Sequence, residues 1–451
     1  SFTKWDAQPT TLSECIDTRH EAYRQAVTPP TGPAMMVIDI ELQKEEAQDF
    51  DLPRFRPAVI EGVDTATAKD IAEKLLNASN PRLETGMFRT PNGIEAAVEL
   101  AELIGASTST TSTGGPMGFP QRHPLCGPGA ESNYDYVLGL EADASDLSLK
   151  RPIVNSLTAQ RDVMGIGFGS LREDYVPAPP GSEPTPLDRN PRQRQGTVLK
   201  VDAQASIPLI VAELSRLITP AKQREIEQRK ARHARANRET FLTALKVAVE
   251  EKKKGWDLSP VSTARIYAEL WPLIMNEDWC LASPSNFSGA HHRELWEHNK
   301  PYSFLGTQGA GGMGYGPGAC AGAALAARSR GRFVVNVQPD GDLNYAPGAL
   351  WTAVHHELPM LTVMHNNRAW HQEYMFLQYL AGVRGRGTDR GHIGCVLRDP
   401  FIDYSKMAQA YGMDSEGPIE DPALLTAALD RGVKSAKSGK PYLIDVVTQP
   451  R

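Results

Sequence analysis

The chain has 451 residues, of which 41% are hydrophobic, and a formal charge of −6 at pH 7. At roughly 100–200 residues per domain this length predicts two to four domains, and the mildly acidic balance argues against a nucleic-acid or anionic-membrane partner. Five dispersed cysteines without CxxC spacing exclude a disulfide framework, and because no apolar run reaches the ~18 residues of a membrane span, we predict a soluble, cytoplasmic protein.

Residues 1–50 contain one expected helix, at 10–27, and one expected buried strand within 31–42. A lone helix and a lone strand cannot cover their own apolar faces. We therefore predict that this region is the last part of a domain whose other elements lie elsewhere.

Residues 51–205 alternate amphipathic helices with apolar strands, which predicts an α/β domain with a Rossmann-like, mostly parallel sheet flanked by helices. The proline-rich, basic stretch 177–197 is expected to be an exposed loop. The helices are expected at 64–79 and 93–105, and the strands at 134–143 and 197–203.

Residues 206–255 are predicted to form a helical connector. Its charged segment, 219–254, has the composition of a solvated helix. It lacks the interleaved basic and aromatic residues that would indicate RNA or DNA binding.

Residues 256–451 return to helix–strand alternation and predict a second α/β domain with right-handed crossovers. The helices are expected at 259–274, in the second half of 302–331, and at 346–357, 400–412 and 421–436. The strands are expected at the start of 278–289 and at 332–337, 359–367 and 441–448.

The stretch GAGGMG (309–314) fits GxGxxG between an expected strand and helix, and Asp340 follows the next strand. A dinucleotide-binding unit has this pattern, so an NAD-dependent oxidoreductase is one alternative. Against it, Asp340 lies in a loop with its own glycine, whereas a ribose-binding carboxylate would cap its strand. The next strand along the chain also ends in an asparagine pair, Asn366 and Asn367.

Carboxylate and carboxamide groups therefore follow two strands that are expected to be neighbours. Mg²⁺ prefers octahedral oxygen ligands and usually bridges protein to phosphates. The carboxyl ends of parallel strands, opposite helix N-termini, are also where a diphosphate binds. The pattern thus favours a metal–diphosphate site over a dinucleotide site.

The motif PDGD…NN resembles the thiamine-diphosphate (ThDP) signature, in which GDG is followed at a characteristic interval by NN. The superfamily is that of acetolactate synthase, benzoylformate decarboxylase and pyruvate decarboxylase. Further stretches resemble the same superfamily, so that the resemblance covers nearly the whole chain: GPAMMVIDIELQ, SNPRLETGMF, AELIGASTSTTSTGGPMGFPQRHPL and YDYVLGLEAD.

This resemblance implies a ThDP- and Mg²⁺-dependent lyase or carboligase that acts on a 2-oxo acid or a 2-hydroxy ketone, as acetolactate synthases do. A 2-oxo acid decarboxylase and a cofactor-binding but inactive subunit are the alternatives. No motif requires FAD. Residues 256–451 would bind the diphosphate, and 1–50 would end a pyrimidine-binding domain. The rest of that domain, with its activating glutamate, would come from a partner fragment in a homo-oligomer, a dimer or a tetramer.

Two aspartates compete for the family's metal position. Asp340 lies 27 residues before Asn367, the usual spacing in acetolactate synthases, whereas Asp342 lies 25 residues before it. We therefore assign the metal to Asp340 and expect Asp342 beside the diphosphate. Pro339 departs from the family pattern, which has a glycine there that lets the chain turn tightly.

The family motifs also imply roles for other positions. The metal would bind Asp340, the Asn367 side chain and the Ala369 carbonyl, and Met313 would hold the cofactor in its bent conformation. Catalytic candidates are Glu373, His371 and Gln372, which follow the cofactor loop. The residues implied to contact the cofactor are Ser285, Asn286, Gly311, Met313, Gly341, Asp342 and Asn367.

Overall fold

The computed structural model describes residues 3, 5–28, 33–46, 49, 60–110, 117–131, 133–141, 155–157, 197–199, 201–282, 291–306 and 312–450. The chain divides into two compact units. The first comprises Ser1–Ser112 and Pro124–Asn237, and the second Thr113–His123 and Arg238–Arg451. The finer four-part division expected from the sequence stays a prediction.

The first unit contains a five-stranded parallel sheet in the order β4-β3-β5-β6-β7 and a separate two-stranded sheet, β1-β2. Its elements are β1 (Trp5–Ala7), α1 (Leu12–Val27), β2 (Ala34–Met36), α2 (Ile40–Lys44), α3 (Thr65–Asn77), β3 (Pro81–Thr85), α4 (Pro91–Ile104), β4 (Ser107–Thr110), β5 (Tyr136–Leu140), β6 (Asn155–Leu157), β7 (Thr197–Leu199) and α5 (Ala203–Leu217), followed by α6 (Pro220–Lys252), which continues into the second unit.

Near the N-terminus, the expected helix is confirmed as α1, but the expectation of a buried strand in 31–42 is wrong. The strand β2 is only three residues long and is partly exposed. Val37 and Ile38, which follow it, are 44% and 38% exposed. The chain then turns into α2, because the Asp39 side chain accepts a hydrogen bond from the Glu41 N–H and caps that helix.

The expected helices and the strand expected at 134–143 are confirmed, whereas the strand expected at 197–203 is shorter: β7 ends at Leu199, and Asp202 caps α5. Helix α3 begins after Asp64, whose side chain accepts a hydrogen bond from the Thr67 N–H, and α4 ends at Gly105 in the left-handed conformation. Every residue of β3 and β5 is buried, as is usual for strands covered on both faces of a parallel sheet. The predicted loop at 177–197 lies almost entirely outside the described residues.

The second unit contains a five-stranded parallel sheet in the order β11-β12-β10-β9-β8. Its elements are α7 (Thr263–Ile274), β8 (Trp279–Leu281), α8 (His291–Leu295), α9 (Tyr315–Arg328), β9 (Phe333–Pro339), α10 (Asp340–Leu343), α11 (Gly348–His355), β10 (Met360–Asn366), α12 (His371–Val383), α13 (Tyr404–Ala410), β11 (Asp414–Ile419), a 3-10 turn (Pro422–Leu424), α14 (Leu425–Lys437) and β12 (Tyr442–Val447).

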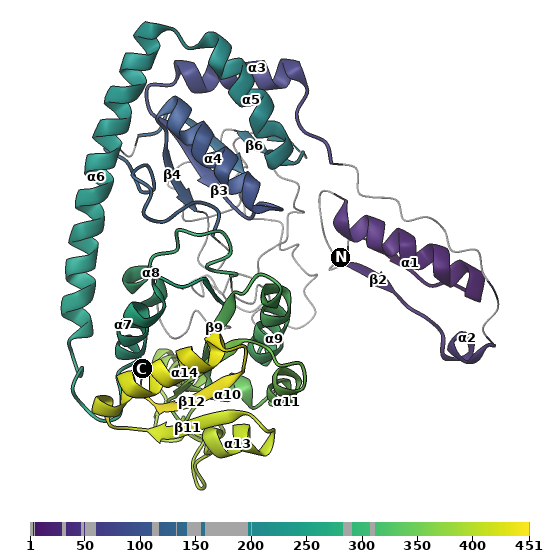
Figure 1. Ribbon diagram of the computed structural model, residues 1–451, viewed down its shortest axis with the longest axis vertical. Coiled ribbons are helices and arrows are strands. Elements are labelled where there is room, and N and C mark those ends of the chain that lie inside the picture. The colour runs from purple at the N-terminus through teal and green to yellow at the C-terminus, as the bar shows by residue number, and fades with distance from the viewer. Residues whose placement is uncertain are drawn as a thin grey trace. The chain divides into compact units, whose positions relative to one another are not determined.

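Helices cover both faces of this sheet. Val335 and Val337 pack with α7 and α14 on one face, whereas Val334 packs with α9, α11 and α13 on the other. In Figure 1, α14 and α13 accordingly lie on opposite sides of β11 and β12. Apolar contacts cover both faces of the sheet. The polar edge where β9 and β10 end is therefore a place where a binding site can form.

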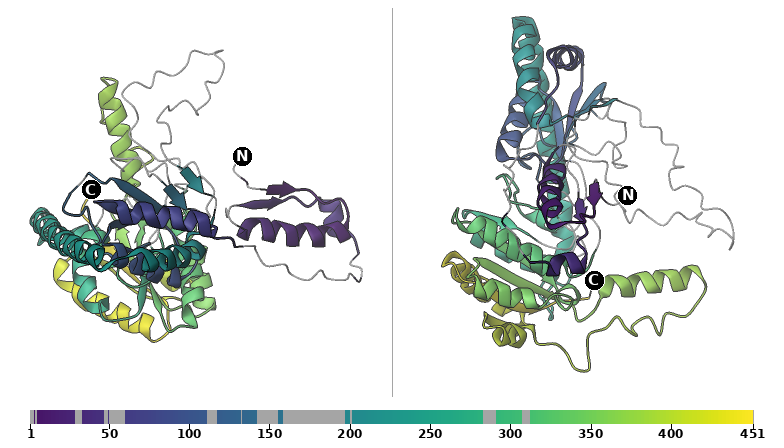
Figure 2. Two further views of the ribbon diagram at one scale, coloured as in Figure 1. Left: turned by 90° about the horizontal axis from the view of Figure 1, so that it is seen from above. Right: turned by 90° about the vertical axis from the view of Figure 1, so that its right-hand side faces the viewer.

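Helix α12 and strand β11 are two elements that the sequence pattern did not predict. Helix α12 has apolar residues around much of its circumference and buries none of them, so it lacks the stripe that identifies a packed helix. Figure 2 shows α12 extending away from the sheet of its unit. Strand β11 (DSEGPI) contains glycine and proline, which disfavour strands. No helix among the described residues is both long and apolar enough to cross a membrane.

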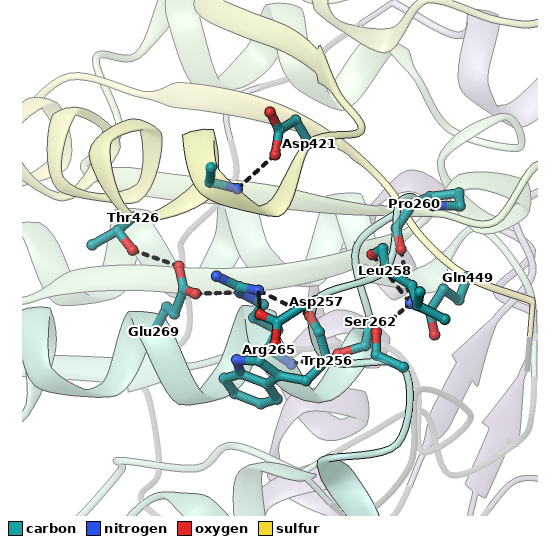
Figure 3. Close-up of polar contacts among 12 residues, drawn as sticks. Trp256, Asp257, Leu258, Pro260, Ser262, Arg265, Glu269, Asp421, Thr426 and Gln449 are labelled. Atoms are coloured by element: carbon teal, nitrogen blue, oxygen red, sulfur yellow. Dashed lines mark hydrogen bonds and ion pairs between the residues drawn. The ribbon is translucent and has the colours of Figure 1, made fainter.

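A polar network ties the segment before α7 to the C-terminal strand and to α14 (Figure 3). Arg265 donates to the Trp256 carbonyl at 2.9 Å and to Glu269 at 2.5 Å. Glu269 also accepts from the Thr426 hydroxyl at 2.5 Å. The Gln449 side-chain amide donates to the carbonyl of Pro260 at 2.9 Å. The Glu269–Thr426 and Pro260–Gln449 contacts join residues more than 150 positions apart in the chain.

We expect Arg265→Met to lower the free energy of unfolding of the second unit by about 1–3 kcal/mol, because it removes the cationic partner of the largely buried Glu269, which keeps only the Thr426 hydroxyl, and the donor to the Trp256 carbonyl. Urea denaturation measures this change. Lys434→Met is the matched control, because the Lys434–Asp430 pair is exposed and should contribute under about 0.5 kcal/mol. Equal effects of the two substitutions would show that the network adds no more stability than a surface ion pair.

Candidate metal and cofactor site

Two of the implied metal ligands converge where β9 and β10 end. Asp340 is the first residue of α10, directly after β9, and Asn367 follows β10. The Ala369 N–H donates to Asp340 Oδ2 at 3.1 Å and to Asn367 Oδ1 at 3.2 Å. Since β9 and β10 are parallel neighbours, their carboxyl ends bring these oxygens together.

The backbone at Pro339 explains why proline can stand there. Pro339 has φ −64° and ψ 142°, so it is extended and lies at the φ that a proline ring favours. It ends β9 opposite His365 and precedes the first turn of α10. The position therefore does not require the conformational freedom of glycine.

Asp340 is buried, with 1% of its surface exposed. Burial raises the pKa of Asp340 to about 7, against the lowering effect of hydrogen bonds from neighbouring backbone N–H groups such as that of Gly341. Among the described residues, no lysine or arginine forms an ion pair with it. A buried carboxylate without a cationic side chain is well suited to a metal ion, so the residues present fit Mg²⁺.

The two asparagines at the end of β10 point to different partners. Asn366 is buried and donates to Asp445 Oδ1 at 2.9 Å, whereas Asn367 lies beside Asp340. Arg368 between Asn367 and Ala369 has φ +60°, a left-handed backbone that is uncommon for a non-glycine residue. This tight turn brings Ala369 back over Asp340.

Asp445 and Tyr404 support this arrangement and were not expected from the sequence. Asp445 Oδ2 accepts from the Tyr404 N–H at 3.1 Å, and the Tyr404 hydroxyl donates to the Asp340 carbonyl at 3.3 Å. Burial raises the pKa of Asp445 to about 6. The sequence did contain an indication of the role of Asp445, because it is the one charged residue inside the apolar strand YLIDVV.

Asp342 lies two residues beyond Asp340 and is 7% exposed. Its Oδ1 accepts from the Gly314 N–H at 2.7 Å, and its Oδ2 accepts from Gln338 Nε2 at 2.8 Å. The expected contact of Asp342 with a diphosphate stays a prediction.

Gly341 lies directly under the indole of Trp370. A Cβ added at Gly341 would come within 2.5 Å of Trp370 Cδ1 and Nε1. The Trp370 backbone is held by its N–H, which donates to the Cys395 carbonyl at 2.7 Å. Only glycine therefore fits between Asp340 and Asp342 while the indole keeps its place.

We expect Gly341→Ala to displace the Trp370 indole and to cost about 1–3 kcal/mol of stability, measured by chemical denaturation. In a Trp370→Ala background the same substitution should cost little, because the obstructing ring is gone; a double-mutant cycle measures this coupling. Gly348→Ala is the control, since no atom lies within 4 Å of the added Cβ. Additive costs at Gly341 and Trp370 would contradict the steric explanation.

The catalytic candidates begin α12. His371 is its first residue, and its ring contacts that of Tyr374 edge-on with centroids 6.0 Å apart. Gln372 is partly buried, and Glu373 is exposed in the first turn of the helix. Their roles stay predictions.

Of the remaining cofactor candidates, Met313 is the one that lies among the described residues. Met313 precedes α9 and is 44% exposed, as a residue that contacts a ligand can be. Ser285, Asn286 and Gly311 lie outside the described residues. Within the described part of the chain, no three His, Cys, Asp or Glu side chains gather around a possible metal position. The candidate metal site instead combines one carboxylate, one carboxamide and one backbone carbonyl.

Comparison with known proteins shows what the region that holds this site is similar to. Residues 287–446 match the family model for the C-terminal TPP-binding domain of thiamine pyrophosphate enzymes. The second unit thus contains a thiamine-pyrophosphate-binding domain. Beyond this domain, the chain is similar to acetolactate synthases and benzoylformate decarboxylases.

The relatives are distant. The acetolactate synthase large subunit IlvG of Mycobacterium tuberculosis is 29% identical over 195 residues, which are 43% of this chain and 32% of that protein, so this match spans about a third of the relative's length. Benzoylformate decarboxylase of Pseudomonas aeruginosa is 24% identical over 99% of this chain and 76% of its own length. The crystal structure of benzoylformate decarboxylase from Polynucleobacter necessarius aligns with a TM-score of 0.67 at 16% identity, covering 100% of this chain and 77% of that chain. That structural likeness shows a shared fold.

Proposed function

We propose that this protein is a ThDP- and Mg²⁺-dependent lyase or carboligase that acts on a 2-oxo acid or a 2-hydroxy ketone. One observation carries the proposal: the side-chain oxygens of Asp340 and Asn367 both lie within hydrogen-bonding distance of the Ala369 N–H. Two oxygen ligands at one edge of a parallel sheet suit a hard cation that bridges protein to a diphosphate.

The roles follow from the surroundings of each group. Asp340 would bind Mg²⁺ through its carboxylate, Asn367 through its side-chain oxygen and Ala369 through its carbonyl. Tyr404 and Asp445 would keep this turn rigid, because they bond the Asp340 carbonyl and the end of β10. Met313 would contact the cofactor from the turn before α9.

Bound thiamine diphosphate would supply a nucleophilic carbon that adds to a substrate carbonyl and holds the electron pair left when a bond to that carbonyl carbon breaks. His371 and Gln372 would orient the substrate from the first turn of α12. Glu373 would donate or accept a proton there, as its exposed carboxylate is accessible.

A 2-oxo acid decarboxylase is the second candidate, and the place of Glu373 favours it. An exposed Glu373 carboxyl beside the metal turn would take up a proton from water and, in its protonated form, donate it to the carbon that has lost carbon dioxide. Incubation with pyruvate or benzoylformate, followed by product analysis, separates the two: a ligated hydroxy ketone or acetohydroxy acid supports a carboligase, and an aldehyde supports a decarboxylase.

A thermal shift measurement tests the cofactor. We expect ThDP with Mg²⁺ to raise the melting temperature of the protein, whereas NAD should not. A shift with NAD and none with ThDP plus Mg²⁺ would refute the proposal. Binding of ThDP without turnover of any 2-oxo acid would instead identify a cofactor-binding but inactive subunit.

We also propose that the protein acts as a homo-oligomer, with a pyrimidine-binding domain completing the active site. Exposed apolar side chains on α9, α11 and α12 support an interface in the second unit; they include Leu325, Trp351, Phe376 and Tyr379, which are 46–55% exposed. Light scattering after size-exclusion chromatography tests this, and a monomer at micromolar concentration would count against it.

A further inference from the structure

The carboxylate of Asp342 joins two segments that are distant in the sequence. One oxygen accepts from the backbone N–H of Gly314, in the turn before α9, at 2.7 Å. The other accepts from the side-chain amide of Gln338, near the end of β9, at 2.8 Å. Asp342 therefore links the Gly-rich turn to the turn that carries Asp340.

A chain of buried amides holds Asp342 in place. A carboxylate only accepts hydrogen bonds, so Gln338 must present its NH₂ group to Asp342. The Gln338 oxygen then accepts from the Asn336 side-chain amide at 3.1 Å. Asn336 and Gln338 are at most 1% exposed. The Gln338 amide also donates to the Pro339 carbonyl at 3.1 Å, so rotating Asp342 away would cost it one of its two acceptors in a buried position, which is unfavourable.

Gly314 can adopt only a narrow range of positions. Its backbone is left-handed, with φ +86°, and a Cβ placed there would lie 2.8 Å from the Cβ of Tyr345. Tyr345 follows α10 closely in the chain. The Gly314 peptide is therefore held from two sides, by Asp342 and by Tyr345, and Met313 directly precedes it.

We propose that Asp342 is a positioning residue that fixes the turn bearing Met313 relative to the metal-binding turn at Asp340, so that a single cofactor molecule can contact both. This inference rests on the proposed function. Asp342 would then act through Gly314 without touching the metal or the diphosphate, in place of the direct contact expected from the sequence, because both of its oxygens already accept hydrogen bonds. A carboxylate suits the role because its two oxygens reach the Gly314 N–H and the Gln338 amide at once, which a serine or alanine side chain cannot do.

The test compares two ligands on the same protein: ThDP, which needs both turns, and inorganic pyrophosphate, which needs only the metal turn, each titrated calorimetrically in saturating Mg²⁺. We expect Asp342→Ala to raise the dissociation constant of ThDP by about tenfold or more and that of pyrophosphate by less than about twofold. The dissociation constant of ThDP for Asp342→Asn should lie between those for wild type and Asp342→Ala, because the remaining side-chain oxygen can still accept from Gly314.

The controls separate this role from general damage. Asp421→Asn alters a carboxylate that accepts from the backbone N–H of Ala423 at 2.9 Å (Figure 3) and should change neither affinity. Asp340→Ala should abolish binding of both ligands. If Asp342→Ala weakens both ligands equally, or neither, the inference is overturned. A wild-type protein that binds pyrophosphate with Mg²⁺ but not ThDP contradicts the proposed function, and the inference with it.

Discussion

Asp340→Asn is expected to abolish the stabilisation of this protein by ThDP and Mg²⁺. At about 100 times its dissociation constant a ligand stabilises a folded protein by about 2.7 kcal/mol, and the variant should lose all of it. The substitution removes the carboxylate that would bind the metal. It should not unfold the unliganded protein, because it replaces a buried carboxyl that has no cationic partner among the described residues.

Thermal denaturation with and without ThDP plus Mg²⁺ measures this effect. Asp430→Asn, on the exposed face of α14, is the control and should respond as wild type does. If Asp340→Asn still responds and Asp342→Asn does not, the metal aspartate is Asp342 and the assignment is shifted by two residues.

Acid destabilisation through His292 and His298 is the second large effect that we expect. Both side chains are buried, and His292 Nδ1 lies 3.2 Å from His298 Nε2. The pKa of His292 is lowered to about 2 and that of His298 to about 4, chiefly by burial, with a smaller contribution to each from the nearby Arg293. Between pH 6.5 and about 4 the folded state therefore binds fewer protons than the unfolded state.

Above pH 6.5 both histidines are neutral in the folded and unfolded states, so they do not lower the free energy of unfolding. As the pH falls from 6.5 to about 4, the unfolded state is protonated first and the free energy of unfolding decreases. The slope approaches about 1.4 kcal/mol per pH unit for each residue. Urea denaturation between pH 7.5 and pH 5 measures it. The double variant His292→Gln/His298→Gln should show a shallower pH dependence, whereas His356→Gln, at an exposed position, should not. Equal slopes in all three proteins would show that the buried pair does not carry the effect.

Much of the second unit could be predicted from its sequence, because its strands are short apolar runs with clear ends. The runs RFVVNV and MLTVM predict β9 and β10, and parallel pairing places their carboxyl ends at one edge. The sequence thus predicts that Asp340 and Asn367 lie close together. It could not separate the roles of Asn366 and Asn367, because Asn366 pairs with Asp445, 79 residues away.

The helix that carries the catalytic candidates was harder to predict for a physical reason. A packed helix reveals itself by an apolar stripe on one face, but α12 buries no residue. Its apolar side chains therefore follow no helical period. The role of Trp370, just before α12, was equally hard to predict from the sequence, because its contact with Gly341 depends on where the turn after β10 folds back.

By itself, the sequence determined the α/β class and the strands that end in polar side chains, both of which depend on local patterns. Its resemblance to known enzymes predicts that Asp340 binds the metal. Only the tertiary structure decided what surrounds those side chains. The links from Asp342 to Gly314 and from Asp445 to Asn366 join residues 28 and 79 positions apart. Such contacts form when separate strands and helices pack together, and local sequence periodicity does not predict them.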